Sequence, residues 1–277
     1  MTKLPATTDG IERDLALAVA AAREAGVRVE GLRKSGRWAD EAILGDIGDQ
    51  AADGYLRGLL EGRCPGDGVL SEETADSSVR LSKSRVWIVD PLDGTKEYGQ
   101  RREDWAVHVA LCIDGQCALG AVALPASGAV LWGVCLPGQE RAGLDQGTGQ
   151  SLLRGDSPGP AAPRMVVSRS HTPEWTSRFA SLLGVGEQQP VGSVGFKVSR
   201  LLLGHADVYV HKKGLKEWDT CAPEAVARAL GWSVCRLRGD AHRYNQKDPK
   251  NHELVVCRPA LKARVLEALS QSGALEA

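Results

Sequence analysis

The sequence predicts an α/β (α+β) fold in two halves, because three patterns follow one another along the chain. Segments with apolar residues at helical spacing come first. Three apolar, β-branched runs separated by short turns follow, which is typical of an antiparallel sheet. Strand-like and helix-like segments then alternate, which indicates a layered α/β half. The polar, Gly- and Pro-rich segment 138–163 lies between these patterns and predicts two domains, residues 1–158 and 159–277, with the boundary near 155–163.

Two helices are expected at the start of the first half. Apolar residues recur at helical spacing over 11–22, with Asp9 placed to cap the helix. Gly26 and Gly31 weaken its far end, since glycine is a poor helix former. A second helix is expected over about 47–60, where apolar side chains again share one face.

Strands make up the rest of the first half. Residues 69–73 predict a short strand that ends in two acids. Residues 86–90 predict a strand buried on both faces, which Pro91 should end because proline has no N–H for a ladder. Asp114-Gly115 and a second short turn separate the three apolar runs of the expected meander, at 105–115, 117–125 and 129–137.

The second half alternates between the two kinds of element. Strands are expected at 164–170, 206–210 and 253–257, and helices at 172–184, 198–204, 223–231 and 259–270. This alternation indicates an α/β layered half.

Composition excludes several classes of protein. The formal net charge of the 277 residues is −1 and no block of like charge occurs, which argues against a nucleic-acid binder. Seven cysteines without a C-x-x-C pair are typical of reduced, buried residues in a cytoplasmic protein. The apolar stretch 15–22 is too short for a membrane span and is followed by Arg23, so neither a signal sequence nor a membrane anchor is expected.

Asp90 and Asp93 stand at the carboxyl end of a buried strand, where open α/β sheets bind ligands. Two carboxylates held close repel each other, and a divalent cation such as Mg²⁺ removes that penalty. Gly94 and Thr95 add a sharp turn, exposed N–H groups and a hydroxyl, which suit a phosphate. Alone, the segment is equally typical of a strand-ending turn with an aspartate cap.

Further acids stand at the ends of other elements. Glu72 and Glu73 follow the short strand, and Asp219 precedes Pro223, which suits the first turn of a helix. Alone, the glutamates would fit a solvated loop and Asp219 a helix cap. Together with Asp90 and Asp93, these residues favour a multi-metal site for phosphoryl chemistry.

Three motifs resemble one known family. "SEE" (71–73), "DPLDGT" (90–95) and "WDTCAPE" (218–224) occur in the order found in the lithium-sensitive, Mg²⁺-dependent phosphatases of the inositol monophosphatase superfamily. The resemblance covers roughly residues 9–270 and implies an αβαβα sandwich, with an antiparallel sheet in the first half and a smaller mixed sheet in the second. "DGTKEY" (93–98) is similar to the CysQ-type 3'(2'),5'-bisphosphate nucleotidase branch.

The resemblance implies a role for each matching residue. Two or three Mg²⁺ ions would be held by four carboxylates and one backbone carbonyl: Glu72, Asp90, Asp93, Asp219 and Leu92. Li⁺ would inhibit the enzyme. Asp49 and Thr95 would orient the attacking water. The substrate would contact Gly94, Thr95, Ser168, His171, Ser193 and Lys197. Ile47 and Trp38 stand where many relatives carry a threonine and a lysine, which weakens the implied support for a third ion and for the role of Asp49.

The implied activity is hydrolysis of the 3'-phosphate of 3'-phosphoadenosine 5'-phosphate (PAP) to AMP and phosphate, in sulfur assimilation. The sulfated precursor PAPS is an implied second substrate, and a homodimer is an implied assembly. An inositol monophosphatase or fructose-1,6-bisphosphatase is the alternative within the superfamily. A non-catalytic nucleotide- or metal-binding protein is the alternative of another class.

Several of these residues also have plainer interpretations. His171 suits a helix cap near Pro173, and Lys197 suits a solvated helix lysine. The lysines at 212, 213 and 216 suit either a solvated turn or attraction of an anionic nucleotide. Trp218 is expected in the core rather than against an adenine.

Overall fold

The computed structural model describes residues 8–153, 161–170 and 172–276. The first half contains α1 (Thr8–Lys34), α2 (Glu41–Arg63), β1 (Gly68–Ser71), η1 (Ser78–Ser82), β2 (Arg85–Asp93), α3 (Thr95–Gly99), β3 (Ala106–Ile113), β4 (Gln116–Leu124), β5 (Ala129–Val134), β6 (Arg141–Asp145) and β7 (Gln150–Leu152). The second contains β8 (Arg164–Ser168), α4 (Trp175–Leu183), β9 (Glu187–Val191), α5 (Val194–Leu202), β10 (Val208–Lys216), α6 (Glu217–Ala229), β11 (Ser233–Cys235), β12 (Lys250–Cys257), η2 (Pro259–Leu261) and α7 (Lys262–Ser272).

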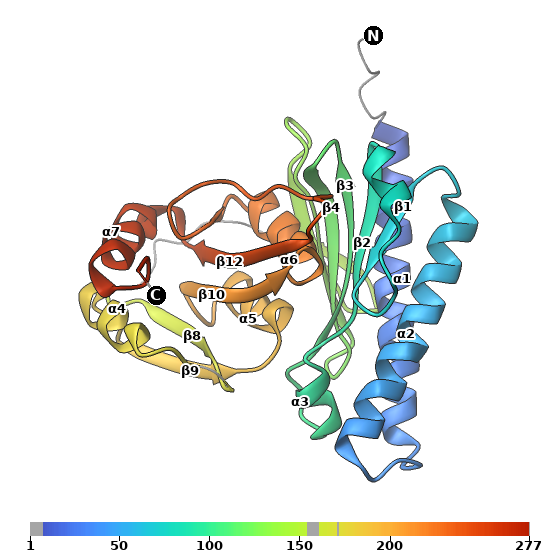
Figure 1. The fold of residues 1–277 in the computed structure, drawn as a ribbon, viewed down its shortest axis with the longest axis horizontal. Helices are drawn as coiled ribbons and strands as arrows, with labels where there is room; N and C mark the ends of the chain where they lie inside the picture. Colours follow the sequence, from blue (N-terminus) through green and yellow to red (C-terminus); the bar gives the residue numbers. More distant parts are fainter. Residues whose placement is uncertain (1–7, 154–160, 171, 277) are drawn as a thin grey trace.

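These elements form five layers, which confirms the predicted αβαβα sandwich (Figure 1). Helices α1 and α2 cover one face of a seven-stranded sheet. Helices α5 and α6 lie between that sheet and a five-stranded sheet, and α4 and α7 cover the far side. The site described below lies where the middle layer meets the first sheet.

Both sheets contain parallel and antiparallel pairs. The larger has the order β1-β2-β3-β4-β5-β6-β7 and the smaller β11-β12-β10-β8-β9. The expectation of a wholly antiparallel first sheet was wrong at one edge, because β1 runs parallel to β2. The connection between these two strands passes through η1, and a parallel pair requires such a crossover. The smaller sheet is mixed, as predicted.

The first helix is longer than its glycines suggested. Helix α1 begins at Thr8, so Asp9 lies in its first turn rather than at a cap, and it continues through Gly26 and Gly31. A Cβ on Gly26 would lie 2.6 Å from Cγ of Pro125, so the missing side chain lets α1 approach the turn after β4. Close packing of this helix outweighs the low helix propensity of glycine.

Two boundaries near the predicted acids also differ from expectation. Pro91 does not end β2, which continues to Asp93; the pairing with β3 shifts register between Asp90 and Asp93, and this irregularity accommodates the proline. Helix α6 begins at Glu217, so Asp219 lies in its first turn rather than ahead of it. There the Asp219 carboxylate accepts a hydrogen bond from the Lys216 N–H at 2.6 Å.

Helix α6 lies very close to the first sheet. A Cβ on Gly120 of β4 would lie 2.8 Å from the Ala222 backbone, and one on Gly133 of β5 would lie 2.7 Å from Val226 Cα. The core between the sheets joins both halves, since Ile88 and Val166 belong to one cluster with Trp218. The predicted division at 158/159 falls outside the described residues and stays a prediction.

Two further findings concern the chain as a whole. Across the described ranges, no helix combines the length and the apolar character that a bilayer span requires. All seven cysteines are free, and all but Cys64 are buried.

Candidate active site

Three carboxylates from two distant parts of the chain meet at one point. Asp90 and Asp93 lie in the last four residues of β2, and Asp219 lies in the first turn of α6. Each offers an oxygen, and these oxygens all lie within 4.8 Å of one another. The first half therefore supplies two acids and the second half supplies the third.

Asp90 is buried and only partly satisfied by hydrogen bonds. Its Oδ1 accepts from the Leu92 N–H at 3.1 Å, but its Oδ2 has no hydrogen-bond partner among the described residues and only faces His108 Nδ1 at 3.9 Å. Burial raises the pKa of Asp90 well above its ordinary value, and the charges of Glu72 and Asp93 raise it further. A buried oxygen without a donor, next to other carboxylates, fits a cation.

Asp93 has the opposite environment, although it is also buried. Its Oδ2 accepts from the Ser193 hydroxyl at 2.5 Å and from the Gly195 N–H at 2.7 Å, and lies 3.2 Å from Nε2 of His108. Burial would raise its pKa, but the charge and hydrogen bond of His108, with the other two donors, lower it to about 2. Asp93 is therefore a fixed negative charge held by residues from both halves.

His108 was missing from the predicted site. It lies fully buried in β3, opposite Asp90 in the ladder, and its Nδ1 is 3.1 Å from the Trp218 carbonyl oxygen. Burial opposes its charged form, yet Asp93 raises the pKa of His108 overall. The available signal was a histidine inside the apolar run 105–113, because a polar ring there requires a buried partner.

Asp219 and Glu72 complete the negative environment. Burial and the charge of Asp93 raise the pKa of Asp219 to about 7, against the hydrogen bond from Lys216. Glu72 follows β1 and keeps a solvent-exposed side, yet loss of hydration at its carboxyl and repulsion from Glu73 raise its pKa to about 7. Glu72 borders the three aspartates rather than joining their close group.

Asp49 and Thr95 lie next to this group on α2 and α3. The Asp49 side chain is buried, and its Oδ1 has no hydrogen-bond partner among the described residues. Burial and Glu73 raise the pKa of Asp49 to about 8, while the Thr95 hydroxyl opposes the rise. Thr95 Oγ1 donates its one proton to the Leu92 carbonyl at 3.1 Å, so the implied carbonyl ligand has a neighbour that fixes its direction.

Gly94 permits the turn between the two elements. Its φ is +95°, a left-handed conformation that favours glycine. A Cβ there would lie 3.2 Å from Cβ of Ser193. The turn that carries Gly94 and Thr95 is thus packed directly against the start of α5.

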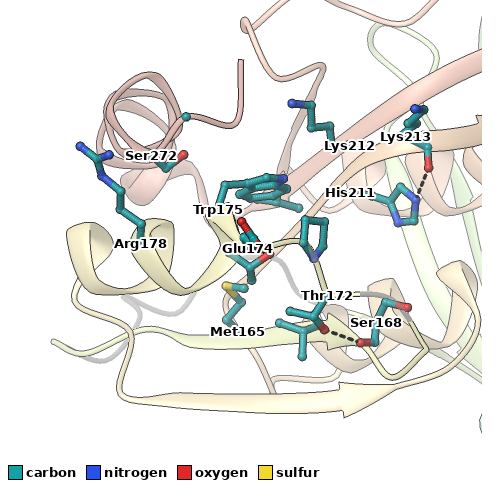
Figure 2. Close-up of a pocket in the computed structure, with 15 residues that line it drawn as sticks. Met165, Ser168, Thr172, Glu174, Trp175, Arg178, His211, Lys212, Lys213 and Ser272 are labelled. Atoms are coloured by element: carbon teal, nitrogen blue, oxygen red, sulfur yellow. Dashed lines mark hydrogen bonds between the residues drawn. The ribbon is translucent and has the colours of Figure 1, made fainter. Parts of the chain in front are cut away.

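The predicted substrate residues divide into two groups. Ser193 and Lys197 lie beside Asp93: Lys197 is buried, its Nζ donates to the Ser193 carbonyl at 3.0 Å, and burial lowers its pKa. Ser168 instead lines a separate cavity at the end of β8, where its carbonyl accepts from Thr172 (Figure 2). His171 lies outside the described residues.

An ion cluster that the sequence did not predict joins the two halves near the site. Arg169 Nη1, just after β8, lies 2.6 Å from Asp104 Oδ2 and 3.5 Å from Glu97 Oε1. Asp104 also accepts from the Gly192 N–H at 2.6 Å. These residues are far apart in the sequence, so no spacing pattern could reveal the cluster.

Comparisons with known proteins agree with this geometry. The sequence model of the inositol monophosphatase family matches residues 12–274. The 3'-phosphoadenosine 5'-phosphate phosphatase of Mycobacterium leprae is 38% identical over 255 residues, which cover 88% of this chain and 89% of that protein. The protein of the same name from Mycobacterium tuberculosis is 38% identical over 239 residues, 83% of each chain. The crystal structure of CysQ from Bacteroides thetaiotaomicron superposes with a TM-score of 0.77 at 26% identity, covering 89% of this chain and 97% of that one.

Proposed function

The chain belongs to the inositol monophosphatase family, and from that premise we propose that it is a Mg²⁺-dependent phosphatase that removes the 3'-phosphate of PAP. The observation that carries the proposal is the meeting of Asp90, Asp93 and Asp219 at one point beside Thr95. The mycobacterial relatives named for this activity support the choice of substrate.

The residues fit Mg²⁺ by their chemistry. The close group offers only carboxylate oxygens, the hard ligands that Mg²⁺ prefers, and Asp90 Oδ2 has no hydrogen-bond partner among the described residues. Asp90, Asp93 and Asp219, with Glu72 and the Leu92 carbonyl, would hold the ions. When bound, Mg²⁺ supplies positive charge that relieves the carboxylate repulsion and stabilises charge developing on the phosphate.

The chain's own residues orient the reaction. Thr95 and the Gly94 turn hold the phosphate, while Asp49, fixed beside Thr95, aligns a water and accepts its proton as the oxygen attacks phosphorus. The bond between phosphorus and the ribose 3'-oxygen breaks, that oxygen takes a proton from water, Asp49 returns its proton to solvent, and AMP and phosphate leave. His108 and Ser193 keep Asp93 charged and fixed throughout.

The nucleotide side of the site is built from the second half. Lys197 is a buried cation beside the acids, and Ser193 begins the same helix. We propose that these two residues contact the nucleotide, while the contacts expected of Ser168 and His171 stay predictions. The Arg169 cluster fixes the end of β8 next to that region, because it ties Arg169 to Asp104 and Glu97 of the first half.

A substrate panel tests the proposal. Phosphate release should be fastest from PAP, and slower or absent from AMP, inositol 1-phosphate and fructose 1,6-bisphosphate, each measured with Mg²⁺. Asp90→Asn and Asp93→Asn should each lower turnover at least about a hundredfold, whereas Asp248→Asn, an exposed acid paired with Lys250, is the matched control. A preference for the inositol or fructose ester would overturn the substrate, and near-normal turnover in both variants would overturn the site.

Finer features extend the same proposal. PAPS is a second substrate to include in the panel. Removal of PAP gives the protein a role in sulfur assimilation. The site holds two or three Mg²⁺ ions, and Li⁺ inhibits by displacing part of them. The seven free cysteines support a reducing, cytoplasmic location. We expect a homodimer, and light scattering would measure the mass of the particle in solution.

A further inference from the structure

A second cavity lies on the outer face of the smaller sheet (Figure 2). Its volume is about 600 Å³, which is in the range of small-molecule sites. Met165 and Val167 of β8 and Val210 of β10 form its apolar floor, and α4 and the end of α7 form its walls. Successive residues of a strand point to opposite faces, so Val166 and Tyr209 face the middle layer instead. The sheet therefore separates this cavity from the acid site.

Two hydrogen-bond donors in the cavity have no acceptor. The Lys212 ammonium and the Trp175 indole N–H are buried without a hydrogen-bond partner among the described residues. Both side chains line the cavity and are drawn around it in Figure 2. A buried donor without a partner costs free energy, and a buried ammonium costs more. Neither group can accept a hydrogen bond, so a ligand that satisfies them would need to bring acceptors.

The charges around the cavity favour an anion. Lys213 and Arg178 lie at the rim, with Lys212 farther in, and Glu174 is the one carboxylate among the lining residues. Three cations against one carboxylate suit a dianionic group. An ammonium and a guanidinium both form strong charge-assisted hydrogen bonds with phosphate.

We propose that this cavity binds a nucleoside monophosphate, at a site separate from the acids that carry the proposed reaction. The phosphate lies against Lys212, and the planar base lies on the apolar floor, where Trp175 Nε1 donates to a ring nitrogen. The volume, the apolar floor and the two unpaired donors together select a flat ring system that carries an anionic group.

A calorimetric titration of the full chain with AMP, in the presence of Mg²⁺, tests the site. We expect binding in the cavity that Lys212→Met weakens about tenfold or more. Val210→Phe fills the floor without changing charge and should weaken AMP binding similarly. Lys262→Met removes one exposed positive charge from α7, outside the cavity, and is the matched control. Turnover of PAP at saturating Mg²⁺ should be unchanged in all three variants.

The outcomes separate this proposal from the proposed function. If AMP binding is the same in Lys212→Met, Val210→Phe and Lys262→Met, the cavity is not a nucleotide site. If the chain fails to hydrolyse PAP but Lys212→Met still weakens AMP binding, only the proposed function fails. Thermal unfolding serves as the folding control, and Lys212→Met should unfold at or above the wild-type midpoint because it removes an unpaired buried ammonium.

Discussion

Replacing Gly120 with alanine should move Asp219 without touching the site. The new Cβ would lie 2.8 Å from both Cα and the carbonyl oxygen of Ala222, which are backbone atoms of α6 that no rotamer change can remove. Ordinary contact begins at 3.4 Å, so α6 must retreat by about 0.6 Å. Asp219 lies one turn earlier on the same helix and would move with it.

The magnitudes follow from that displacement. Overpacking of this kind costs roughly 1–3 kcal/mol of the free energy of unfolding. A misplacement approaching 1 Å in a catalytic constellation can cost up to about a hundredfold in rate. We therefore expect turnover to fall roughly tenfold or more and the Mg²⁺ concentration for half-maximal activity to rise.

Urea unfolding and Mg²⁺-dependent phosphate release measure the two effects. Gly58→Ala is the matched control, since a Cβ on this exposed residue of α2 meets nothing within 4 Å. It should keep turnover and gain roughly 0.5–1 kcal/mol of stability. A Gly120→Ala protein that loses stability but keeps wild-type turnover and Mg²⁺ dependence would refute the idea that the sheet contact sets the position of Asp219.

Three other perturbations have definite expected outcomes. His242 Nδ1 and Glu224 Oε2 lie 2.7 Å apart; burial opposes both charges, yet the pair raises the pKa of His242 above 6.5 and lowers that of Glu224 below 4.5. The ion pair therefore stabilises the fold fully between pH 4.5 and pH 6.5. This stabilisation is lost as pH rises through the raised pKa of His242, and it is lost as pH falls through the lowered pKa of Glu224. His242→Gln should lose roughly 3–5 kcal/mol in urea unfolding within that window, and a deficit that does not vary with pH would contradict this account. Asp219→Asn should raise the thermal midpoint of the chelator-treated protein, because it relieves carboxylate repulsion. It should also abolish the stability gained on Mg²⁺ binding, which is roughly 2.7 kcal/mol at a hundredfold excess over Kd. An equal gain in stability in the variant would argue against the ligand role. Ser193 has a φ of +49°, so Ser193→Gly should be more stable than Ser193→Ala by about 1 kcal/mol in urea, although both lose the hydrogen bond to Asp93; equal stability would mean that the backbone is not strained.

The sequence predicted the parts of the fold that have strong apolar patterns. The long helices and β2 to β5 carry such patterns, and their type was correct. The short strand β9 (Glu187–Val191) is polar and contains Pro190, and β7 (Gln150–Leu152) is exposed along its length, so neither shows the alternation that marks a strand. These strands exist because a neighbouring strand pairs with them.

The site was predictable where acids stand at element ends and obscure elsewhere. Asp90, Asp93 and Asp219 could be singled out because an acid at a strand end or a helix start is conspicuous. His108 and Asp104 act through partners that only the tertiary structure brings near. One contact crosses from β3 to β2 and the other joins the two halves, and local spacing encodes neither.

The position of α6 has a consequence for how the chain becomes active during synthesis. This helix lies at the centre of the molecule, yet residues 217–229 are among the later parts of the chain to be made. Until they emerge, one face of the first sheet lacks the cover of α6, and Asp90 and Asp93 lack Asp219. Strand β10 leads into this helix and pairs with β12, which ends at Cys257. The chain must therefore close distant contacts late, which predicts slow folding and no ion binding by incomplete chains.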